Sequence, residues 1–206
     1  MVKNYGNPLR KEFFDHAPVP QKTDSFSILT FGGSLGSQEI NQLIFDLIKH
    51  YHLEIKISIL HQIGQNSPPP APSHPRIDYR RVNYLDDIAK EYQKADFIIC
   101  RGGAMTISEL KFVQRPALII PIRFHKDLHQ VHNAKSLKSE AHFPVYVESA
   151  SALSDEGCDK LQYLIKTEYF KYEERVKNKM QNRSQQTIKE QENPSSLIAR
   201  EVLQNV

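Results

Sequence analysis

Residues 97–110 have the sequence FIICRGGAMTISEL, in which a short apolar run ends in two glycines and a helical pattern follows at once. The run Phe97–Cys100 predicts a buried strand, because a parallel strand covered on both faces does not need alternating polar residues. Gly102 and Gly103 allow a sharp turn and a close approach of the backbone to a ligand. The helix expected over Ala104–Val113 directs its first free N–H groups at that turn, where they suit a phosphate.

Glu109 lies one turn into that helix, within reach of the same crevice. A carboxylate there can accept hydrogen bonds from vicinal hydroxyls such as those of a ribose. A glutamate on a helix is more often simply solvated, but the position of Glu109 just beyond the double glycine favours a ligand role. The stretch therefore predicts a nucleotide site at the end of a buried strand.

A second unit of this kind lies closer to the start of the chain. Residues 25–31 (SFSILTF) predict a strand, GGSLGS follows at 32–37, and apolar residues at 3–4 spacing predict a helix over 38–49. On its own, this glycine turn is equally consistent with a plain tight turn. It lacks the spacing of the dinucleotide fingerprint, which weighs against a nicotinamide enzyme.

The rest of the chain continues the alternation. Further strands are expected at 56–60, 77–82, 116–121 and 145–148. Further helices are expected over about 127–139 and in a segment that runs to about residue 94, with Asp86 or Asp87 as its cap. The proline-rich residues 67–73 cannot form a helix or a central strand and predict an exposed excursion. The pattern predicts an α/β fold with a doubly wound parallel sheet, whose ligands bind at the carboxyl ends of the strands. From residue 153 to about 192 the chain is polar and helical, and Asn193-Pro194 predicts the start of a last helix.

Composition restricts the function. At 206 residues the chain has room for one or at most two domains, and its net charge of +3, with acids and bases interleaved, does not favour a nucleic-acid partner. No apolar run approaches the roughly 18 residues that a membrane helix needs, and no secretory signal is recognisable at the start. Cys100 and Cys158 form neither a zinc pattern nor a disulfide framework, so a reducing cytoplasm is expected.

Four motifs in the same order resemble the MurG family of bacterial glycosyltransferases. They are GNPLR at 6–10, GGSLG at 32–36, CRGGAMTISE at 100–109 and HKDLHQVHNA at 125–134. Each motif is weak by itself, and the resemblance rests on all four in register over nearly the whole chain. Members of that family transfer N-acetylglucosamine from UDP-N-acetylglucosamine to an undecaprenyl-pyrophosphoryl-muramyl-pentapeptide, converting lipid I to lipid II in peptidoglycan synthesis.

The resemblance implies the second of two Rossmann-like domains of a GT-B glycosyltransferase. Residues 1–24 would be the interdomain linker, 25–192 the UDP-sugar-binding domain, and 193–206 a helix that packs back on an N-terminal domain. That missing domain would carry the lipid acceptor site, the membrane contact and the catalytic base, so this chain would contain no catalytic residue. The full-length protein would be peripheral on the cytoplasmic face of the inner membrane, and the fragment alone is expected to be inactive. The alternative is a free-standing UDP-sugar-binding subunit that acts with a separate membrane-bound acceptor subunit.

The resemblance also implies roles for individual residues. Ser34 would meet a phosphate, and the backbone of Leu85 would contact the uracil edge, so that the identity of the Leu85 side chain should matter little. Glu109 would hold the ribose hydroxyls, while Arg10 and Arg101 would offset charge on the departing UDP. The start of the following helix would face the pyrophosphate and the sugar through Ala104, Met105, Thr106, Ile107 and Ser108.

His129 and Gln130 would contact hydroxyls of the sugar. His129 stands where the family usually has glutamine, which makes the sugar selectivity less secure, and Gly102 replaces a frequent serine, which we expect to be a smaller change. The implied chemistry is inverting transfer in which dipoles and cations stabilise the leaving diphosphate, with no metal and no cofactor.

Plainer interpretations accompany these roles. Arg101 could simply pair with a carboxylate, and Arg10 could be a surface residue. The spacing of His125, His129 and His132 would place them on one helix face, but nothing nearby completes a zinc site. Half of a UDP-sugar epimerase of similar architecture is a remote third possibility.

Overall fold

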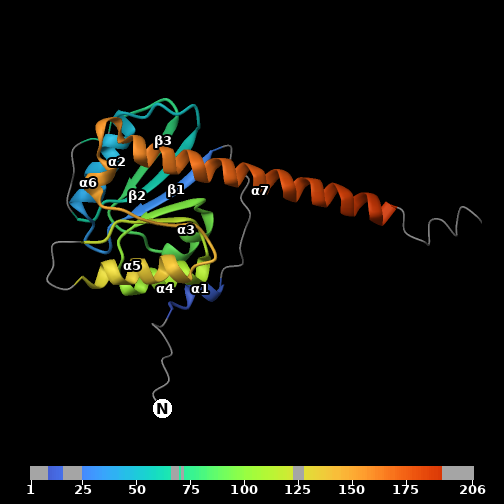
Figure 1. Cartoon of the computed structure of the whole chain (residues 1–206), viewed down its shortest axis with the longest axis horizontal. Helices are drawn as coiled ribbons and strands as arrows, with labels where there is room; N and C mark the ends of the chain where they lie inside the picture. Colours follow the sequence, from blue (N-terminus) through green and yellow to red (C-terminus); the bar gives the residue numbers. More distant parts are fainter. Residues whose placement is uncertain (1–8, 16–24, 66–69, 71, 123–127, 192–206) are drawn as a thin grey trace, which may run out of the picture. The chain divides into compact units, whose positions relative to one another are not determined.

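The computed structural model describes residues 9–15, 25–65, 70, 72–122 and 128–191, with the backbone alone for 15, 156 and 179–191. Its six strands form one all-parallel sheet in the order β3-β2-β1-β4-β5-β6 (Figure 1). The strands are β1 Phe26–Phe31, β2 Ile57–Gln62, β3 Ile77–Val82, β4 Phe97–Cys100, β5 Ala117–Ile119 and β6 Val145–Val147. The predicted doubly wound parallel sheet is confirmed.

The helices alternate with these strands along the chain. They are α1 Glu12–Asp15, α2 Gln38–Lys49, α3 Ile88–Lys94, α4 Ala104–Val113, α5 His129–Glu140, α6 Ala150–Leu153, the 3-10 turn Glu156–Cys158 and α7 Asp159–Gln191. Ser37 begins α2 by accepting a hydrogen bond from the Ile40 N–H, and Asp87 begins α3 by accepting one from Lys90. The predicted start of α2 is confirmed, and of the two candidate caps for α3 the structure uses Asp87.

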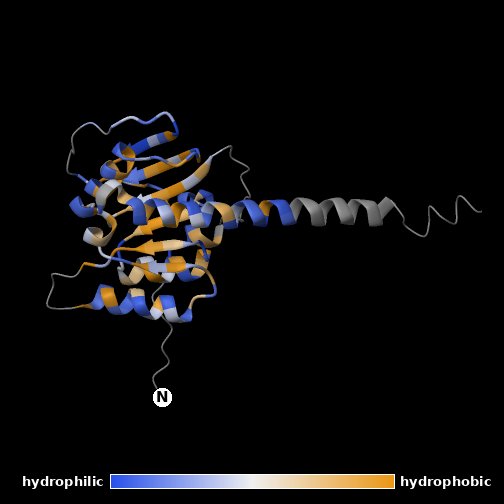
Figure 2. Ribbon diagram, turned by 45° about the horizontal axis from the view of Figure 1, so that its top comes forward, coloured by the Kyte–Doolittle hydropathy of each residue, from blue (hydrophilic) through white to orange (hydrophobic). Residues whose placement is uncertain are grey.

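The two faces of the sheet are covered by different helices. One face carries α1, α3, α4 and α5, whose apolar side chains share a buried cluster with β1, β4, β5 and β6. The other face carries α2, whose Phe45 contacts the rings of His61 on β2 and Tyr79 on β3. Figure 1 shows α1, α4 and α5 together on one side of the sheet and α2 with α6 on the other. Figure 2 shows the central strands as the most hydrophobic ribbons, as expected for strands covered on both faces.

Strand β1 is the point where the winding of the sheet reverses. From β1 the chain proceeds outward through β2 to β3, and then returns to place β4 on the opposite side of β1. The pairing of Phe31 with Cys100 brings the ends of β1 and β4 to the same level. In open α/β sheets the crevice at such a reversal is where ligands bind.

The structure corrects several expectations. Within residues 1–24, the segment expected to be an interdomain linker, Phe13 on α1 is 1% exposed and lies in the core cluster. Strand β5 is only three residues long, shorter than the expected 116–121. It begins after Pro116, because proline has no N–H group to donate to the strand ladder. The helical region beyond residue 153 is interrupted at Gly157 and Cys158, which both have positive φ. The predicted last helix after Asn193, the Gly6-Asn7-Pro8 turn and His125 lie outside the described residues.

The chain divides into two compact units, residues 1–168 and 169–206. All strands and the glycine turns belong to the first unit. In the second, residues 169–191 continue helix α7, where the rings of Tyr169 and Phe170 lie 5.6 Å apart. No helix in the described ranges has the length and apolar character needed to cross a bilayer.

Candidate nucleotide-binding site

The turn that follows β1 is packed against the turn that follows β2. Gly36 has φ +79°, and a Cβ placed on it would lie 2.2 Å from the Ile63 carbonyl oxygen. Gly64 has φ +80°, and its Cβ would lie 2.1 Å from the Leu35 carbonyl oxygen. Glycine is therefore required at both positions by conformation and by space, so the 32–37 turn is more than a generic tight turn. Ser34, the predicted phosphate contact, lies exposed within it.

Polar side chains from β2 and α2 hold this pair of turns in place. The Gln62 side-chain amide donates to the Gly33 carbonyl at 3.2 Å, and the Asn41 amide donates to the Ile63 carbonyl at 3.0 Å. The Asn41 oxygen therefore faces Nε2 of His61 at 3.0 Å and accepts a hydrogen bond from the Nε2–H group. Nδ1 of His61, 2.9 Å from the Tyr79 hydroxyl, is then the acceptor of a hydrogen bond from that hydroxyl. Sequence analysis missed this network, although polar residues in a buried strand were a signal for it.

His61 is completely buried and neutral within this network. Burial lowers the pKa of His61 from 6.5 to about 4, because desolvation disfavours the imidazolium form. The support for the turn thus depends on an uncharged imidazole.

Arg101, at the end of β4, is engaged by the protein itself. It is 8% exposed, and its guanidinium donates to the Ile120 carbonyl at 3.0 Å, to the Ser37 hydroxyl and to a Glu39 oxygen at 2.6 Å. It therefore ties the end of β4 to the first turn of α2 and pairs with a carboxylate, as the plainer interpretation expected. Contact between Arg101 and a diphosphate would have to compete with these bonds.

The double glycine places α5 close to the start of α4. A Cβ on Gly102 would lie 2.5 Å from the Gln130 carbonyl oxygen, and the Asn133 amide donates to the Gly102 carbonyl at 3.2 Å. A serine at residue 102 would not fit this arrangement, because its Cβ would force α5 to move. The Gln130 side chain accepts a hydrogen bond from the Ile122 N–H at 3.2 Å, and its neighbour His129 is exposed.

Helix α4 begins at Gly103, which has no side chain to cap the helix. The N–H groups of Ala104, Met105 and Thr106 precede the first helical bond, from the Ile107 N–H to the Gly103 carbonyl at 3.0 Å. Ala104 and Met105 are exposed, so this helix start is open to an anion.

The next two predicted contacts are already used by the fold. Ile107 lies in the core cluster with its N–H bonded, and the Ser108 hydroxyl donates to the Ala104 carbonyl at 3.3 Å. Leu85 is 7% exposed in the same cluster, which makes the identity of its side chain important for packing, contrary to expectation.

Glu109 is buried, with 3% of its surface exposed. Its Oε2 accepts a hydrogen bond from the Tyr92 hydroxyl at 3.0 Å, and its Oε1 lies 3.9 Å from Nε of Arg10. Burial raises the pKa of Glu109, and the Tyr92 hydrogen bond and the Arg10 charge oppose that rise. The structure thus brings the predicted ribose contact together with a predicted phosphate contact from the first segment, and adds Tyr92, which sequence analysis missed.

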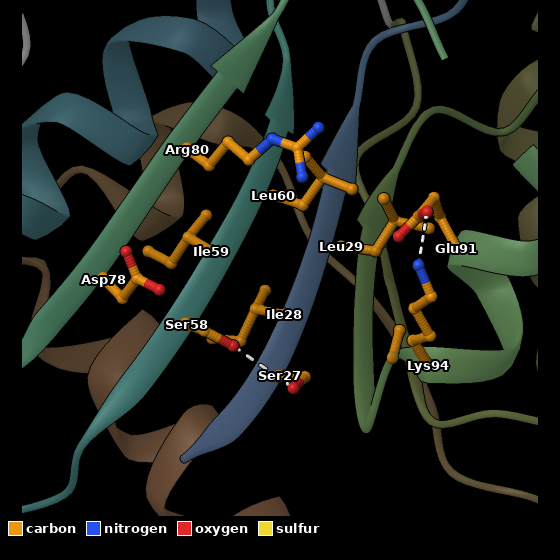
Figure 3. A pocket seen from close by; sticks show the side chains of 11 residues that line it. Ser27, Ile28, Leu29, Ser58, Ile59, Leu60, Asp78, Arg80, Glu91 and Lys94 are labelled. Carbon is orange, nitrogen blue, oxygen red and sulfur yellow. Dashed lines mark hydrogen bonds and ion pairs between the residues drawn. The ribbon is translucent and has the colours of Figure 1, made fainter. Parts of the chain in front are cut away.

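A separate pocket of about 220 Å³ lies on the sheet face beside α3 (Figure 3). Ser27, Ser58, Asp78 and Arg80 line it from the early and middle parts of three strands, and Lys94 lines it from α3. The described part of the β2–β3 connection contains no helix that could cover this area. The pocket therefore belongs to the open part of the sheet face and not to the glycine turns.

Within the described ranges, no group of three or more His, Cys, Asp and Glu side chains could hold a metal ion. The zinc alternative included His125, which lies outside those ranges. Together, the described residues present the uncapped start of α4, the exposed turn after β1 and the buried carboxylate of Glu109.

Comparison with known proteins agrees with this geometry. Residues 27–193 match the Glycosyltransferase family 28 C-terminal domain. The chain belongs to this family. It is 39% identical over 138 residues to the UDP-N-acetylglucosamine–N-acetylmuramyl-(pentapeptide) pyrophosphoryl-undecaprenol N-acetylglucosamine transferase of Syntrophus aciditrophicus, covering 64% of this chain and 38% of that protein. The protein of the same name from Histophilus somni is 30% identical over 197 residues, with 90% of this chain and 54% of that protein covered.

A solved structure is similar as well. The crystal structure of MurG from Acinetobacter baumannii aligns with a TM-score of 0.60 and 28% identity, over 78% of this chain and 44% of that one. This glycosyltransferase family 28 domain has the fold of the C-terminal half of a GT-B glycosyltransferase. The chain spans about two fifths to one half of the length of these relatives.

Proposed function

We propose that this glycosyltransferase family 28 domain binds UDP-N-acetylglucosamine as the donor for transfer to a lipid-linked muramyl-pentapeptide in peptidoglycan synthesis. The observation that carries the proposal is the meeting of two glycine turns at the ends of β1 and β4, where the sheet reverses. The open start of α4 then supplies N–H groups for the diphosphate, and Glu109 lies one turn further for the ribose. The transferases named above share this half of their length with the chain.

The residues take the following roles in this proposal. Ser34 and the N–H groups of Ala104, Met105 and Thr106 face the diphosphate, and the backbone of Leu85 faces the uracil. His129 and Gln130, at the start of α5, face the sugar. The chain's part in catalysis is to stabilise the leaving diphosphate with oriented N–H groups and with Arg10, while the acceptor and the base that activates it come from another domain or subunit.

The donor site is tested by calorimetric titration of the chain with UDP, UDP-N-acetylglucosamine and NADH. We expect uridine-selective binding that Glu109→Gln weakens by about 10- to 150-fold, since a hydrogen bond to a charged group contributes about 1.5–3 kcal/mol. Glu174→Gln, a change at an exposed residue of α7, is the matched control and should leave the affinity unchanged. Selective binding of NADH, or equal UDP affinity in the Glu109 and Glu174 variants, would contradict the proposal.

The requirement for a partner is tested separately. We expect no transfer from UDP-N-acetylglucosamine to lipid acceptor by this chain alone, and turnover when an acceptor-binding domain or a membrane-bound acceptor subunit is added. Turnover by the chain alone would show that the base lies within it.

A further inference from the structure

The proposed ribose contact, Glu109, is itself contacted by Tyr92 and Arg10, and the donor-site proposal leaves the role of Tyr92 unexplained. Glu109 presents two carboxylate oxygens in different surroundings. Oε2 accepts from the Tyr92 hydroxyl at 3.0 Å, whereas Oε1 is buried and has no hydrogen-bond partner within the described part of the chain. A buried acceptor without a donor costs free energy, so its retention calls for a reason such as a ligand that supplies the donor.

Tyr92 is held more firmly than the carboxylate it contacts. Its side chain is completely buried, and its ring packs against Phe13 at 5.6 Å and Phe31 at 5.7 Å between centroids. The hydroxyl therefore has little freedom and defines where Oε2 must lie. Oε2 already accepts from Tyr92, so Oε1, which accepts no hydrogen bond within the described part of the chain, is the oxygen better placed to accept from an incoming hydroxyl.

Arg10 is held loosely by comparison. Its Nε lies 3.9 Å from Oε1, which is an ion pair but too long for a hydrogen bond, and its side chain is 47% exposed. Glu109 is nevertheless only 3% exposed, so a ribose hydroxyl can reach Oε1 only if its surroundings give way. Arg10 is the neighbour with room to swing aside, because its side chain is half-exposed, whereas Tyr92 and Phe13 are buried in the core cluster.

We propose that Tyr92 is a positioning residue that reserves Oε1 of Glu109 for a ribose hydroxyl, and that Arg10 leaves Oε1 for the diphosphate when the nucleotide binds. The inference rests on the proposed donor site. Tyr92 does not touch the ligand; it acts through Glu109. Arg10 exchanges one anionic partner, Glu109, for another, the diphosphate. Its guanidinium moves to the phosphates when the ribose hydroxyl binds to Oε1.

The positioning role is tested with UDP and 2′,3′-dideoxy-UDP, which lacks both ribose hydroxyls. The wild-type protein should prefer UDP by about tenfold or more, the value of a hydrogen bond to a charged acceptor. Tyr92→Phe keeps the ring packing and should reduce this preference to about threefold or less while leaving the affinity for the dideoxy compound unchanged. Tyr51→Phe is the matched control, because that buried tyrosine donates to the Ile55 carbonyl away from the site and should keep the full preference.

The pH profile provides an independent readout. The Tyr92 hydrogen bond opposes the rise in the pKa of Glu109 that burial causes. Removing it should therefore move the acid limb of UDP binding to higher pH, since the carboxylate must be ionised to accept two hydrogen bonds. A purely structural defect would weaken both nucleotides together and leave the pH of the limb unchanged.

Arg10 is tested by comparing uridine with UDP. Arg10→Gln should weaken UDP binding by about fivefold or more and leave uridine binding unchanged or tighter at pH 8, because only UDP carries the phosphates that receive the arginine. An equal loss of uridine and UDP affinity would overturn the exchange. An unchanged UDP preference in Tyr92→Phe, with that preference lost in Glu109→Gln, would overturn the positioning role alone, whereas absence of UDP binding by the wild-type protein would overturn the donor site itself.

Discussion

Alanine at Gly36 should destabilise the protein by about 3 kcal/mol or more, the sum of a left-handed backbone penalty and the overpacking of a closed contact. The added Cβ would lie 2.2 Å from the Ile63 carbonyl oxygen and 2.9 Å from the Gly64 Cα, both of them backbone atoms that cannot rotate away. The two turns would have to separate, and the Gln62 and Asn41 hydrogen bonds that join them would be strained. We therefore expect loss of UDP binding together with the loss of stability, measured by urea unfolding of the full chain.

Two other glycines provide graded controls for this change. Gly33 has φ +92° with nothing within 4 Å of an added Cβ, so alanine there should cost only about 1 kcal/mol from backbone strain. Gly103 has no positive φ, and its Cβ would meet Thr106 Oγ1 at an ordinary 3.8 Å, so Gly103→Ala should be close to neutral. Equal stability of the Gly36 and Gly33 variants would show that the contact between the two turns is not required.

Acidification below pH 6.5 should destabilise the protein through His61. Because the pKa of His61 is about 4 in the folded protein and 6.5 as a model value, the unfolded chain binds a proton in this range that the folded chain does not. The contribution of His61 to the free energy of unfolding is therefore fully present above pH 6.5. It is lost as the pH falls towards 4, by roughly 3 kcal/mol in total. Below pH 4 the contribution of His61 should become level.

The contribution of His61 is isolated by comparing the wild-type protein with His61→Gln. Glutamine cannot be protonated, although its amide can replace part of the contact with Asn41 and Tyr79. The variant should be less stable at pH 7, and the difference in the free energy of unfolding between the two proteins should shrink as the pH falls from 6.5 to 4. A difference that stays constant over this range would contradict a buried neutral imidazole. Other groups that titrate in this range in both proteins cancel in the comparison.

The predictions for Gly36 and His61 test the same part of the structure. Gly36 and His61 belong to the same support, which joins the turn after β1 to the turn after β2. Gly36 is essential because no Cβ fits between the two turns. His61 is essential because its neutral ring forms hydrogen bonds with Asn41 and Tyr79. Substitution of either residue should therefore disturb the turn that carries Ser34, the proposed phosphate contact.

Local sequence was sufficient to predict most of the regular structure. Strands β3 and β4 and helices α2 and α4 have the predicted bounds, because apolar periodicity, caps and glycine punctuation act over a few neighbouring residues. The parallel α/β class followed from the alternation of these elements. The same reasoning identified both glycine turns, since a glycine turn after a buried strand is a local signal.

Contacts between distant segments were decided only by the tertiary structure. The pairing of β1 with β4 brings the two glycine turns together, and no spacing in the chain specifies which strands become neighbours. Packing also placed Phe13 of the expected linker in the core. Arg101 became paired with Glu39 and Ser37. Glu109 became buried between Tyr92 and Arg10. The partners of a residue depend on long-range burial and charge compensation, and these arise only when the sheet and its helices have come together. The sequence by itself determined the helices, strands and turns. The assembled fold determined which side chains remain free for a ligand.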